Sequence, residues 1–303
     1  MRVGAAELSL TNALRDRDSY DAVIASARGA RVVLGLLAGG TLALVGASFQ
    51  ALFRNPLGDP YALGVSGGAA LGATAAVLLG AGALSTPVAA FAGAVAAMVL
   101  VLMVARGTGR VGAASMLLAG MVLNASTNAA LAFLRSVVRS SRAQETLSVL
   151  LGVVTEEPWA RVGVVAALAL AGVGILLSRA WSMNLLALGD ESAASLGVEV
   201  ERTEALLFFA SSLAVASVVS VCGLIPFVGL IVPHYARAYV GGDHRALLPA
   251  CFFGGGALLV IADAATRAMF PLVGAEPPVG ALTALVGAPF FLVMLRRMSS
   301  REG

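Results

Sequence analysis

The sequence is poor in charged and aromatic residues and in residues that bind metals. Only 12% of its 303 residues are charged and 6% are aromatic, and it has two cysteines and two histidines. Cys222 and Cys251 lie in apolar segments and make neither a disulfide framework nor a metal site. The motifs GxxxxGK[ST], HExxH and CxxC are absent, so we expect no ATP hydrolysis and no enzymatic activity of these kinds from this chain.

Apolar residues dominate instead. They make up 59% of the chain, with a mean hydropathy of +0.91, whereas a soluble domain is about 45–50% apolar. A water-soluble core of this size could not bury so much apolar surface, which predicts a polytopic membrane protein. The 35 glycines favour close helix packing in lipid. No basic run is interleaved with aromatic residues, so we expect no binding to nucleic acid.

The uncharged runs predict an all-α polytopic membrane protein with about nine transmembrane helices in a multi-helix bundle. Pro87 divides one long run, and Pro226 and Pro233 divide another into a helix, a bend and a shorter helix. The runs are 32–49, 61–105, 111–134, 162–178, 205–236, 246–262 and 281–295.

Polar segments flank and interrupt this region. Residues 1–31 form an N-terminal polar segment that lacks the pattern of a signal peptide. Residues 32–297 form the predicted transmembrane domain, and 298–303 a cytoplasmic tail. The stretch 135–161 is polar, and we expect it to contain a short surface helix.

Arginine placement predicts the orientation. If Asn55 faces the cytoplasm, nearly every short loop on that side carries arginine, whereas loops 82–87 and 270–280 on the other side carry none. The exceptions lie in the longer outer stretch: Arg135, Arg139, Arg142 and Arg161.

Between the first two runs lies Gly46–Gly68, which reads GASFQALFRNPLGDPYALGVSGG. Pro56 and Pro60 cannot continue a helix, and Asn55 and Asp59 suit caps and turns. The composition predicts a tight surface loop joining two spans. Just beyond Pro60, glycines at 64, 68 and 72 form a stripe that predicts close helix packing.

Four polar residues lie in the middle of the run 111–134: Asn124, Ser126, Thr127 and Asn128. Inside a span such side chains either satisfy one another and a neighbouring helix or line a polar path. The sequence leaves both readings open.

The segment Leu185–Arg202, LLALGDESAASLGVEVER, is too polar to cross a membrane. Its small residues permit close contact with a partner, and Asp190 and Glu191 can cap a helix start. From composition alone it could equally be a solvated amphipathic loop.

Two further stretches contain residues that invite a functional reading. His234 follows Pro233 in CGLIPFVGLIVPH, where a haem or metal role competes with a structural hydrogen bond at a helix end. Asp263 and Arg267 are spaced i, i+4, so they can pair on one helix face near the outer surface.

Together these stretches resemble one family, the permease subunits of bacterial ABC importers for iron-siderophores, haem and vitamin B12. The similarity is carried by RNPLGDPYALGVSGGAALGA, LLALGDESAASLGVEVER, CGLIPFVGLIVPH and the region from Asp263 to Arg297. This sequence departs from the pattern at Leu224, a usual proline, and Pro226, a usual glycine. The family usually has about ten helices, and the first of them has no counterpart before Val32.

The resemblance implies a homodimer in the bacterial inner membrane, with a cytoplasmic ABC ATPase dimer that binds ATP and Mg²⁺ and a solute-binding protein outside. It implies no cofactor on this chain. It assigns ATPase coupling to Leu188, Gly189, Asp190, Ala193, Leu196 and Gly197. It assigns binding-protein docking to Arg28, Arg31 and Arg267, and the path or gate to Asn124, Ser126, Thr127 and Asn128. Its structural signature is Asn55, Pro56, Asp59, Pro60, Pro233 and His234.

The alternatives are a secondary transporter or channel that works without an ATPase and, more remotely, an integral-membrane enzyme. A proton- or sodium-driven transporter requires a carboxylate deep in the spans, and we expect none, since Asp263 has its own arginine. A membrane enzyme requires a clustered His/Asp/Glu site, which is not visible in the sequence.

Overall fold

The computed structural model describes residues 20–80, 85–107, 112–137 and 152–299, and these residues form helices and connecting loops without any strand. The helices are α2 (Tyr20–Leu52), η1 (Pro60–Leu63), α3 (Val65–Leu78), α4 (Ser85–Gly107), α5 (Ala113–Val137), α7 (Trp159–Ser178), α8 (Ala180–Leu186), α9 (Asp190–Ser195), α10 (Val200–Cys222), α11 (Val228–Val240), α12 (His244–Ala268), α13 (Phe270–Val273) and α14 (Val279–Ser299).

Within the described chain, 6 helices are long and apolar enough to cross a membrane: α2, α4, α5, α7, α10 and α12. Two shorter apolar helices accompany them, α3 and the part of α14 from Val279 to Leu292. The all-α polytopic fold class is confirmed. The surface helix expected within 135–161 falls largely on 138–151, which lie outside the described residues.

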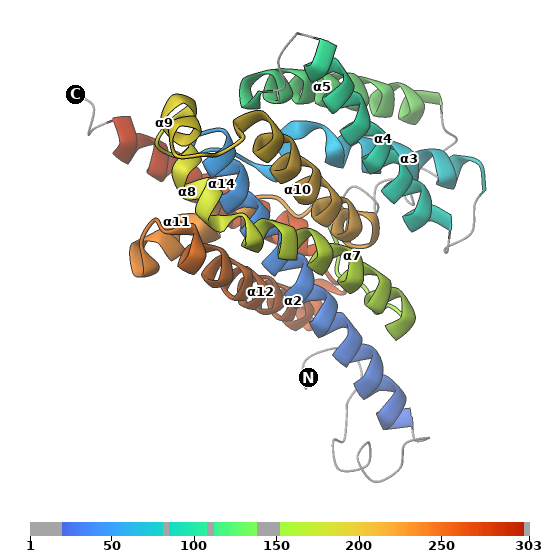
Figure 1. Ribbon diagram of the computed structural model, residues 1–303. Helices are drawn as coiled ribbons and strands as arrows, with labels where there is room; N and C mark the ends of the chain where they lie inside the picture. Colours follow the sequence, from blue (N-terminus) through green and yellow to red (C-terminus); the bar gives the residue numbers. More distant parts are fainter. Residues whose placement is uncertain (1–19, 81–84, 108–111, 138–151, 300–303) are drawn as a thin grey trace.

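Helix α2 forms the centre of the bundle. It lies along α12 and also contacts α7, α10 and α11 (Figure 1). Its residues from Leu37 to Leu52 are all buried. Outer helices of a membrane protein leave one side exposed to lipid, so this part of α2 is surrounded by other helices. The helix begins at Tyr20, well before the predicted Val32, so residues 20–31 continue the span instead of forming a separate segment.

Glycines set the closest helix contacts. A Cβ atom on Gly39 of α2 would lie 2.2 Å from the carbonyl oxygen of Gly255 on α12. A Cβ on Gly68 or Gly72 of α3 would lie 2.5 Å or 2.2 Å from a backbone oxygen of α4. Because small residues let backbones approach in lipid, the packing predicted for these two glycines is confirmed. Gly64 differs, since its φ of 77° makes it the left-handed cap before α3.

The second divided run breaks where Pro226 predicted it. Helix α10 ends at Cys222, and α11 begins at Val228 after Phe227, whose φ is 69°. The expectation that Pro233 also ends a helix is wrong, because Pro233 lies inside α11. Proline cannot donate to the carbonyl of residue i−4. That carbonyl, on Gly229, instead accepts a hydrogen bond from Gln50 Nε2 of α2 at 3.3 Å.

The loop after α2 is the predicted surface turn only at Arg54, Asn55 and Pro56, which are exposed. It turns back into the bundle, where Gly58 and Pro60 are buried. The Tyr61 hydroxyl accepts a hydrogen bond at 3.0 Å from the backbone N–H of Ile225, in the break between α10 and α11. The predicted turn chemistry holds: Asn55 Oδ1 accepts from Leu57 N at 2.9 Å, and Asp59 Oδ1 from Tyr61 N at 2.8 Å.

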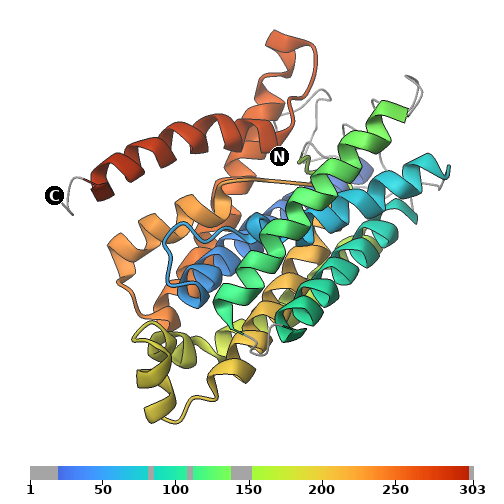
Figure 2. The same ribbon diagram turned by 90° about the horizontal axis from the view of Figure 1, so that it is seen from above.

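Two features at the edges of the bundle position the functional regions. The short helices α8 and α9 lie at the same end of the molecule as the C-terminus of α2 (Figure 1). Helix α14 packs on α11 and α12 but diverges from the body of the bundle, away from the pair α3 and α4 (Figure 2).

Candidate functional site: coupling segment, membrane cavity and outer charge cluster

The polar segment 185–202 contains the end of α8, a turn and the short helix α9. We call residues 180–202, which include all of α8, the coupling segment. Helix α8 buries Met183, Leu185 and Leu186 against the bundle. Helix α9 buries Ala193 and leaves its other residues largely exposed. Gly189 precedes α9 and Gly197 follows it, with φ of 108° and 87°. Residues with a Cβ rarely adopt these backbone conformations.

The residues predicted to couple to an ATPase lie at the exposed tip of this segment. Leu188 and Leu196 are 64% and 59% exposed although they are large and apolar. No atom of another residue lies within 4 Å of a Cβ built on Gly189 or Gly197. Exposed leucines beside open glycines are typical of a surface that a partner covers. The coupling role itself stays a prediction.

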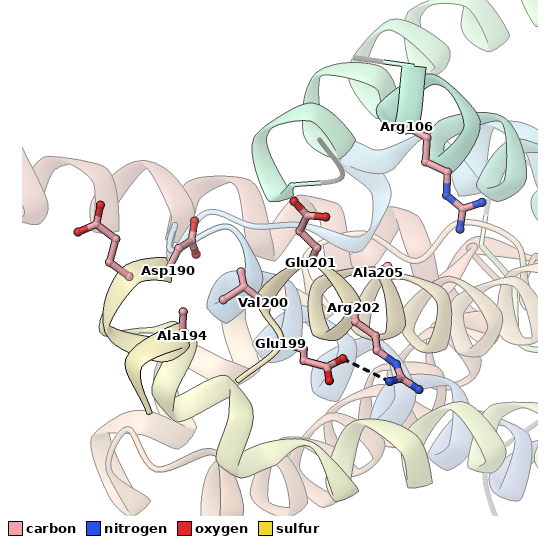
Figure 3. A pocket seen from close by; sticks show the side chains of 9 residues that line it. Arg106, Asp190, Ala194, Glu199, Val200, Glu201, Arg202 and Ala205 are labelled. Carbon is pink, nitrogen blue, oxygen red and sulfur yellow. Dashed lines mark hydrogen bonds and ion pairs between the residues drawn. The ribbon is translucent and has the colours of Figure 1, made fainter. Parts of the chain in front are cut away.

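An acidic groove of about 710 Å³ runs beside the tip (Figure 3). Four carboxylates and two arginines line it: Asp190, Glu191, Glu199, Glu201, Arg106 and Arg202. Arg202 is paired with Glu199 at 3.2 Å, so carboxylates remain in excess. A partner that enters this groove is therefore expected to present cationic or hydrogen-bond-donating groups.

Polar contacts fasten the coupling segment to the bundle at two places. Arg54, just after α2, donates from Nε to the Leu186 carbonyl at 2.9 Å and forms an ion pair with Asp190. Asn184 donates to Asp243 Oδ1 at 2.6 Å and accepts from the His244 N–H at 2.9 Å, which joins α8 to the start of α12. Hydrogen bonds from Arg245 N and then from Asn184 hold the pKa of Asp243 below its usual value.

A third contact lies just beyond the segment. Glu204 of α10 is 3% exposed, and its Oε2 accepts from the backbone N–H of Ala113 at 3.0 Å. Ala113 is the first residue of α5, so a carboxylate from α10 caps that helix and is favoured by its dipole. The coupling segment is thus linked, directly or through α10, to α2, α5 and α12.

A cavity of about 430 Å³ opens on the inward-turned loop. Its polar lining comes from Asp59, Tyr61, Ser66, Asn124 and Asn128. Its apolar lining comes from the segment before α7, the α10–α11 break and α14: Gly152, Leu224, Pro226, Gly280, Ala281 and Ala284. None of these described lining residues is lysine, arginine or histidine.

The structure separates the four predicted path residues. Asn124 and Asn128 line the cavity, one helical turn apart on the same face of α5. Thr127 is buried, donates to the Asn124 carbonyl at 3.0 Å and lies against Gly67. Ser126 is exposed and donates to the Val122 carbonyl at 2.9 Å. The two asparagines therefore fit the path reading, and Ser126 and Thr127 fit the packing reading.

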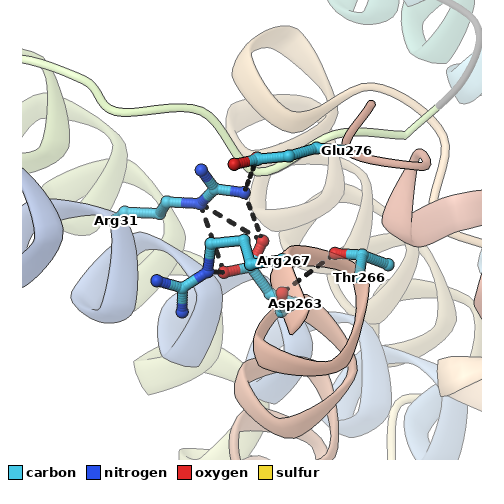
Figure 4. A network of polar contacts seen from close by, with 5 residues as sticks. All are labelled: Arg31, Asp263, Thr266, Arg267 and Glu276. Carbon is cyan, nitrogen blue, oxygen red and sulfur yellow. Dashed lines mark hydrogen bonds and ion pairs between the residues drawn. The ribbon is translucent and has the colours of Figure 1, made fainter. Parts of the chain in front are cut away.

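At the other end of α2, charged residues form a compact outer cluster (Figure 4). The guanidinium of Arg31 bonds to Asp263 at 2.9 Å and to Glu276 at 3.1 Å. Arg267 pairs with the other oxygen of Asp263 at 3.1 Å, which confirms the predicted i, i+4 pair. Asp263 is buried between the two arginines, which satisfy a charge that would be costly alone.

Two of the three arginines predicted to dock a binding protein, Arg31 and Arg267, are thus already engaged in this cluster. The side chains of Arg31 and Arg267 are 9% and 7% exposed, and Arg28 is also buried. Glu276, in the loop before α14, is the more exposed carboxylate of the cluster, at 36%. Docking through these arginines stays a prediction, and it would have to compete with Glu276.

His234 lies in the middle of α11 and not at a helix end as predicted. Its ring makes edge contacts with Tyr235 and Phe290, with ring centroids 5.9 Å and 5.8 Å apart. In the described part of the chain, no group of three or more His, Cys, Asp or Glu side chains is arranged to bind a metal. The geometry thus gives His234 packing partners and no metal-ligand partners.

Sequence reasoning missed several residues that the structure brings into these sites. Arg54 and Glu204 read as ordinary loop and helix-start charges, and Tyr61 reads as the start of a span. Asp59 was interpreted as a turn residue, which it is, but it also faces the cavity.

The fold defines a multi-pass helical membrane protein with a polar cavity and an exposed polar segment at one end of the bundle. Comparisons with known proteins agree. Residues 1–297 match the model of the FecCD transport family. The cobalamin import system permease protein BtuC of Halobacterium salinarum is 42% identical over 281 residues, covering 92% of this chain and 74% of that protein.

The hemin transport system permease protein HmuU of Yersinia pestis is 37% identical over 284 residues, covering 90% of this chain and 83% of that protein. Among solved structures, a metal-chelate type ABC transporter in an inward-facing conformation superposes with a TM-score of 0.85 at 30% identity, covering 97% of this chain and 92% of that one. The chain belongs to the FecCD transport family, the permease subunits of ABC importers.

Proposed function

We propose that this permease works as a homodimer in the bacterial cytoplasmic membrane, with an ABC ATPase dimer on the cytoplasmic side and a solute-binding protein outside. The ATPase subunits bind ATP and Mg²⁺ and act on this chain through the coupling segment. The observation that carries the proposal is the tip of that segment, where exposed Leu188 and Leu196 stand beside an acidic groove. A surface of this kind, at the arginine-rich side of the membrane, is suited to a cytoplasmic partner.

The cavity supports a cargo class. Carboxylate-bearing cargo, such as ferric citrate or haem with its propionates, would meet Asp59 and no cationic side chain among the described lining residues. An anion in such a low-dielectric site needs a cationic partner. Amides and hydroxyls from Asn124, Asn128 and Ser66 instead suit a cargo rich in neutral amide groups. We propose a corrinoid such as cobalamin, which has many primary amides and is the cargo named for the 42%-identical relative.

Two helices support the homodimer. Helices α5 and α14 both contribute to the cavity wall, and both leave large apolar side chains exposed, including Val122, Phe133, Leu285 and Leu292. A second copy that packs on α5 and α14 would cover these side chains and close the cavity along the dimer axis.

One observation favours the alternative of an ATPase-independent secondary transporter. Asp59 places a carboxylate in the cavity, and carboxylates at such positions bind protons or sodium in secondary transporters. Against this, one oxygen of Asp59 is already used as the cap of η1 through Tyr61 N. The capping bond gives Asp59 a structural task that needs no proton movement.

Reconstituted uptake tests both parts of the proposal. The permease is placed in vesicles with its genomic-neighbour ATPase and binding protein, and uptake of radiolabelled cyanocobalamin is measured with ATP on the cytoplasmic face. We expect ATP-dependent uptake that an ionophore does not abolish and that excess ferric dicitrate or haemin does not inhibit. Uptake abolished by the ionophore and independent of ATP would support the secondary transporter. Uptake of haemin or ferric dicitrate in place of cyanocobalamin would overturn the corrinoid assignment alone.

A further inference from the structure

We call residues 53–59, between α2 and η1, the cavity loop. Arg54 occupies a strained position near the start of this loop. Its φ is 48°. In the described chain, Arg54 and Phe227 are the two non-glycine residues with a positive φ. A residue with a Cβ pays a steric penalty there. Such strain persists where the surrounding contacts determine the conformation, and it points to the contacts that Arg54 makes.

Those contacts join the two helices of the coupling segment. Arg54 Nε donates to the carbonyl of Leu186, the last residue of α8, at 2.9 Å. Its Nη2 pairs with the carboxylate of Asp190, the first residue of α9. Leu186 is 1% exposed, so the carbonyl contact is made against the packed base of the segment. The planar guanidinium fork can reach both acceptors at once, which a lysine ammonium cannot do with the same geometry.

On its other side, Arg54 leads directly into the loop that lines the cavity. This loop is stiffened by its own hydrogen bonds, from Asn55 N to Gln50 O at 3.1 Å and from Gly58 N to Asn55 O at 2.9 Å. It ends at Asp59 and Tyr61, which face the cavity. A displacement of the loop at Arg54 is therefore carried to the cavity lining through a short, internally bonded connection.

We infer that Arg54 is a positioning residue that transmits movement of the coupling segment to the cavity loop. The inference rests on the proposed function, because it needs a partner ATPase that moves α8 and α9. When α9 shifts, the guanidinium fork pulls the loop between Arg54 and Asp59, and the cavity changes its opening to the cytoplasm. The other polar contacts near the coupling segment bond to different helices: Asn184 bonds to the start of α12, and Glu204 to the start of α5.

Thiol labelling of the loop tests this inference without needing the cargo. Leu57 lies between Arg54 and Asp59 and is replaced by cysteine, while the native Cys222 and Cys251 are buried and give little background. The labelling rate with a water-soluble maleimide is compared with and without ATP in the complex with the ATPase. We expect ATP to change the rate in the Leu57→Cys protein, and we expect Arg54→Ala to abolish that change while ATP hydrolysis continues.

The matched control is Arg179→Ala, which removes an exposed arginine just before α8. It is expected to keep the ATP-dependent change. The inference is overturned if Arg54→Ala keeps the change, or if Arg179→Ala loses it equally. If the protein with native Arg54 shows no ATP-dependent change in labelling but still takes up cargo with ATP, the inference fails and the proposed function stands. If it shows neither, both fail.

If the Arg54→Ala protein does not assemble with the ATPase, variants that exchange the charges of Arg54 and Asp190 test the same contact. Arg54→Glu alone is expected to abolish the change, and Arg54→Glu combined with Asp190→Arg is expected to restore part of it, because the ion pair is re-formed in reverse. Equal behaviour of the single and double variants would contradict a role for the contact between positions 54 and 190.

Discussion

The two ends of α2 are both held by arginine–carboxylate contacts, but the contacts differ in burial. At the outer end, the side chains of Arg31 and Asp263 are 9% and 6% exposed. At the inner end, beside α8 and α9, those of Arg54 and Asp190 are 38% and 45% exposed. The outer contact is therefore shielded from solvent on all sides, whereas water can compete with the inner one.

This difference decides which end can move. Removing one partner of a buried ion pair costs about 3–5 kcal/mol, because the other charge stays buried. An exposed pair contributes about 0–1 kcal/mol, because water replaces it readily. The outer end of α2 is thus a fixed clamp, and the inner end is held less firmly, so Arg54 can move together with the coupling segment under the proposed function.

The largest effect is expected from Asp263→Ala in the outer clamp. It leaves the Arg31 and Arg267 guanidinium groups without the carboxylate they share, so we expect a loss of about 3–5 kcal/mol of unfolding free energy. Chemical denaturation in detergent measures it. Glu276→Gln is the matched control, since its carboxylate is more exposed, and it should cost less than about 1 kcal/mol. If the two variants are equally stable, the clamp is not buried as described.

The middle of α2 should behave like the outer clamp and not like the inner contact. Gly39→Ala would place a methyl group 2.2 Å from the Gly255 carbonyl oxygen, so α2 and α12 must separate. We expect a loss of about 1–3 kcal/mol, as for other overpacked interfaces. Gly174→Ala in α7 is the control, since nothing lies within 4 Å of its Cβ position. A stable Gly39→Ala protein would show that this contact is not tight.

Docking of the binding protein tests whether the outer cluster competes for the arginines that would bind it. The pair Arg31→Glu and Arg267→Glu, which the resemblance suggests, would bury carboxylates beside Asp263 and destabilise the fold, so it cannot isolate docking. Glu276→Gln is better, because it removes a competitor for Arg31 without unpairing Asp263. We expect docking to tighten about two- to fivefold, measured by titration with the binding protein.

The control for that titration is Glu156→Gln, which removes another exposed carboxylate just before α7. It should change the affinity less than Glu276→Gln does. Weaker docking of the Glu276→Gln protein would show that Glu276 supports docking and does not compete with it.

The smallest effect on stability is expected at the inner contact. Arg54→Ala should change the unfolding free energy by less than about 1 kcal/mol, because the pair is partly exposed. It should nevertheless lower the amount of cargo moved per ATP hydrolysed, measured in vesicles. A large loss of stability with normal transport per ATP would reverse the roles that we assign to the two ends.

Much of this arrangement could be predicted from local chemistry. Uncharged runs located the spans, Pro226 located the α10–α11 break, and the i, i+4 spacing predicted the pair of Asp263 and Arg267. These features depend on nearby residues along one helix or turn, so a short window of sequence contains the needed information.

The rest depended on contacts between distant segments. The inward turn of the cavity loop is fixed by the bond from Ile225 to Tyr61, and Pro233 stays helical while the Gly229 carbonyl is bonded by Gln50. The engagement of Arg31 is fixed by Asp263 and Glu276. No local pattern reports such pairings, so the sequence does not reveal that Arg31 is engaged or that the second half of the loop is buried.

The most direct test of the account is uptake of cyanocobalamin by vesicles that contain the permease with and without its ATPase partner. We expect uptake only when the ATPase, ATP and the binding protein are all present. Uptake of the same size by the permease alone would contradict an ATP-driven subunit worked through its coupling segment.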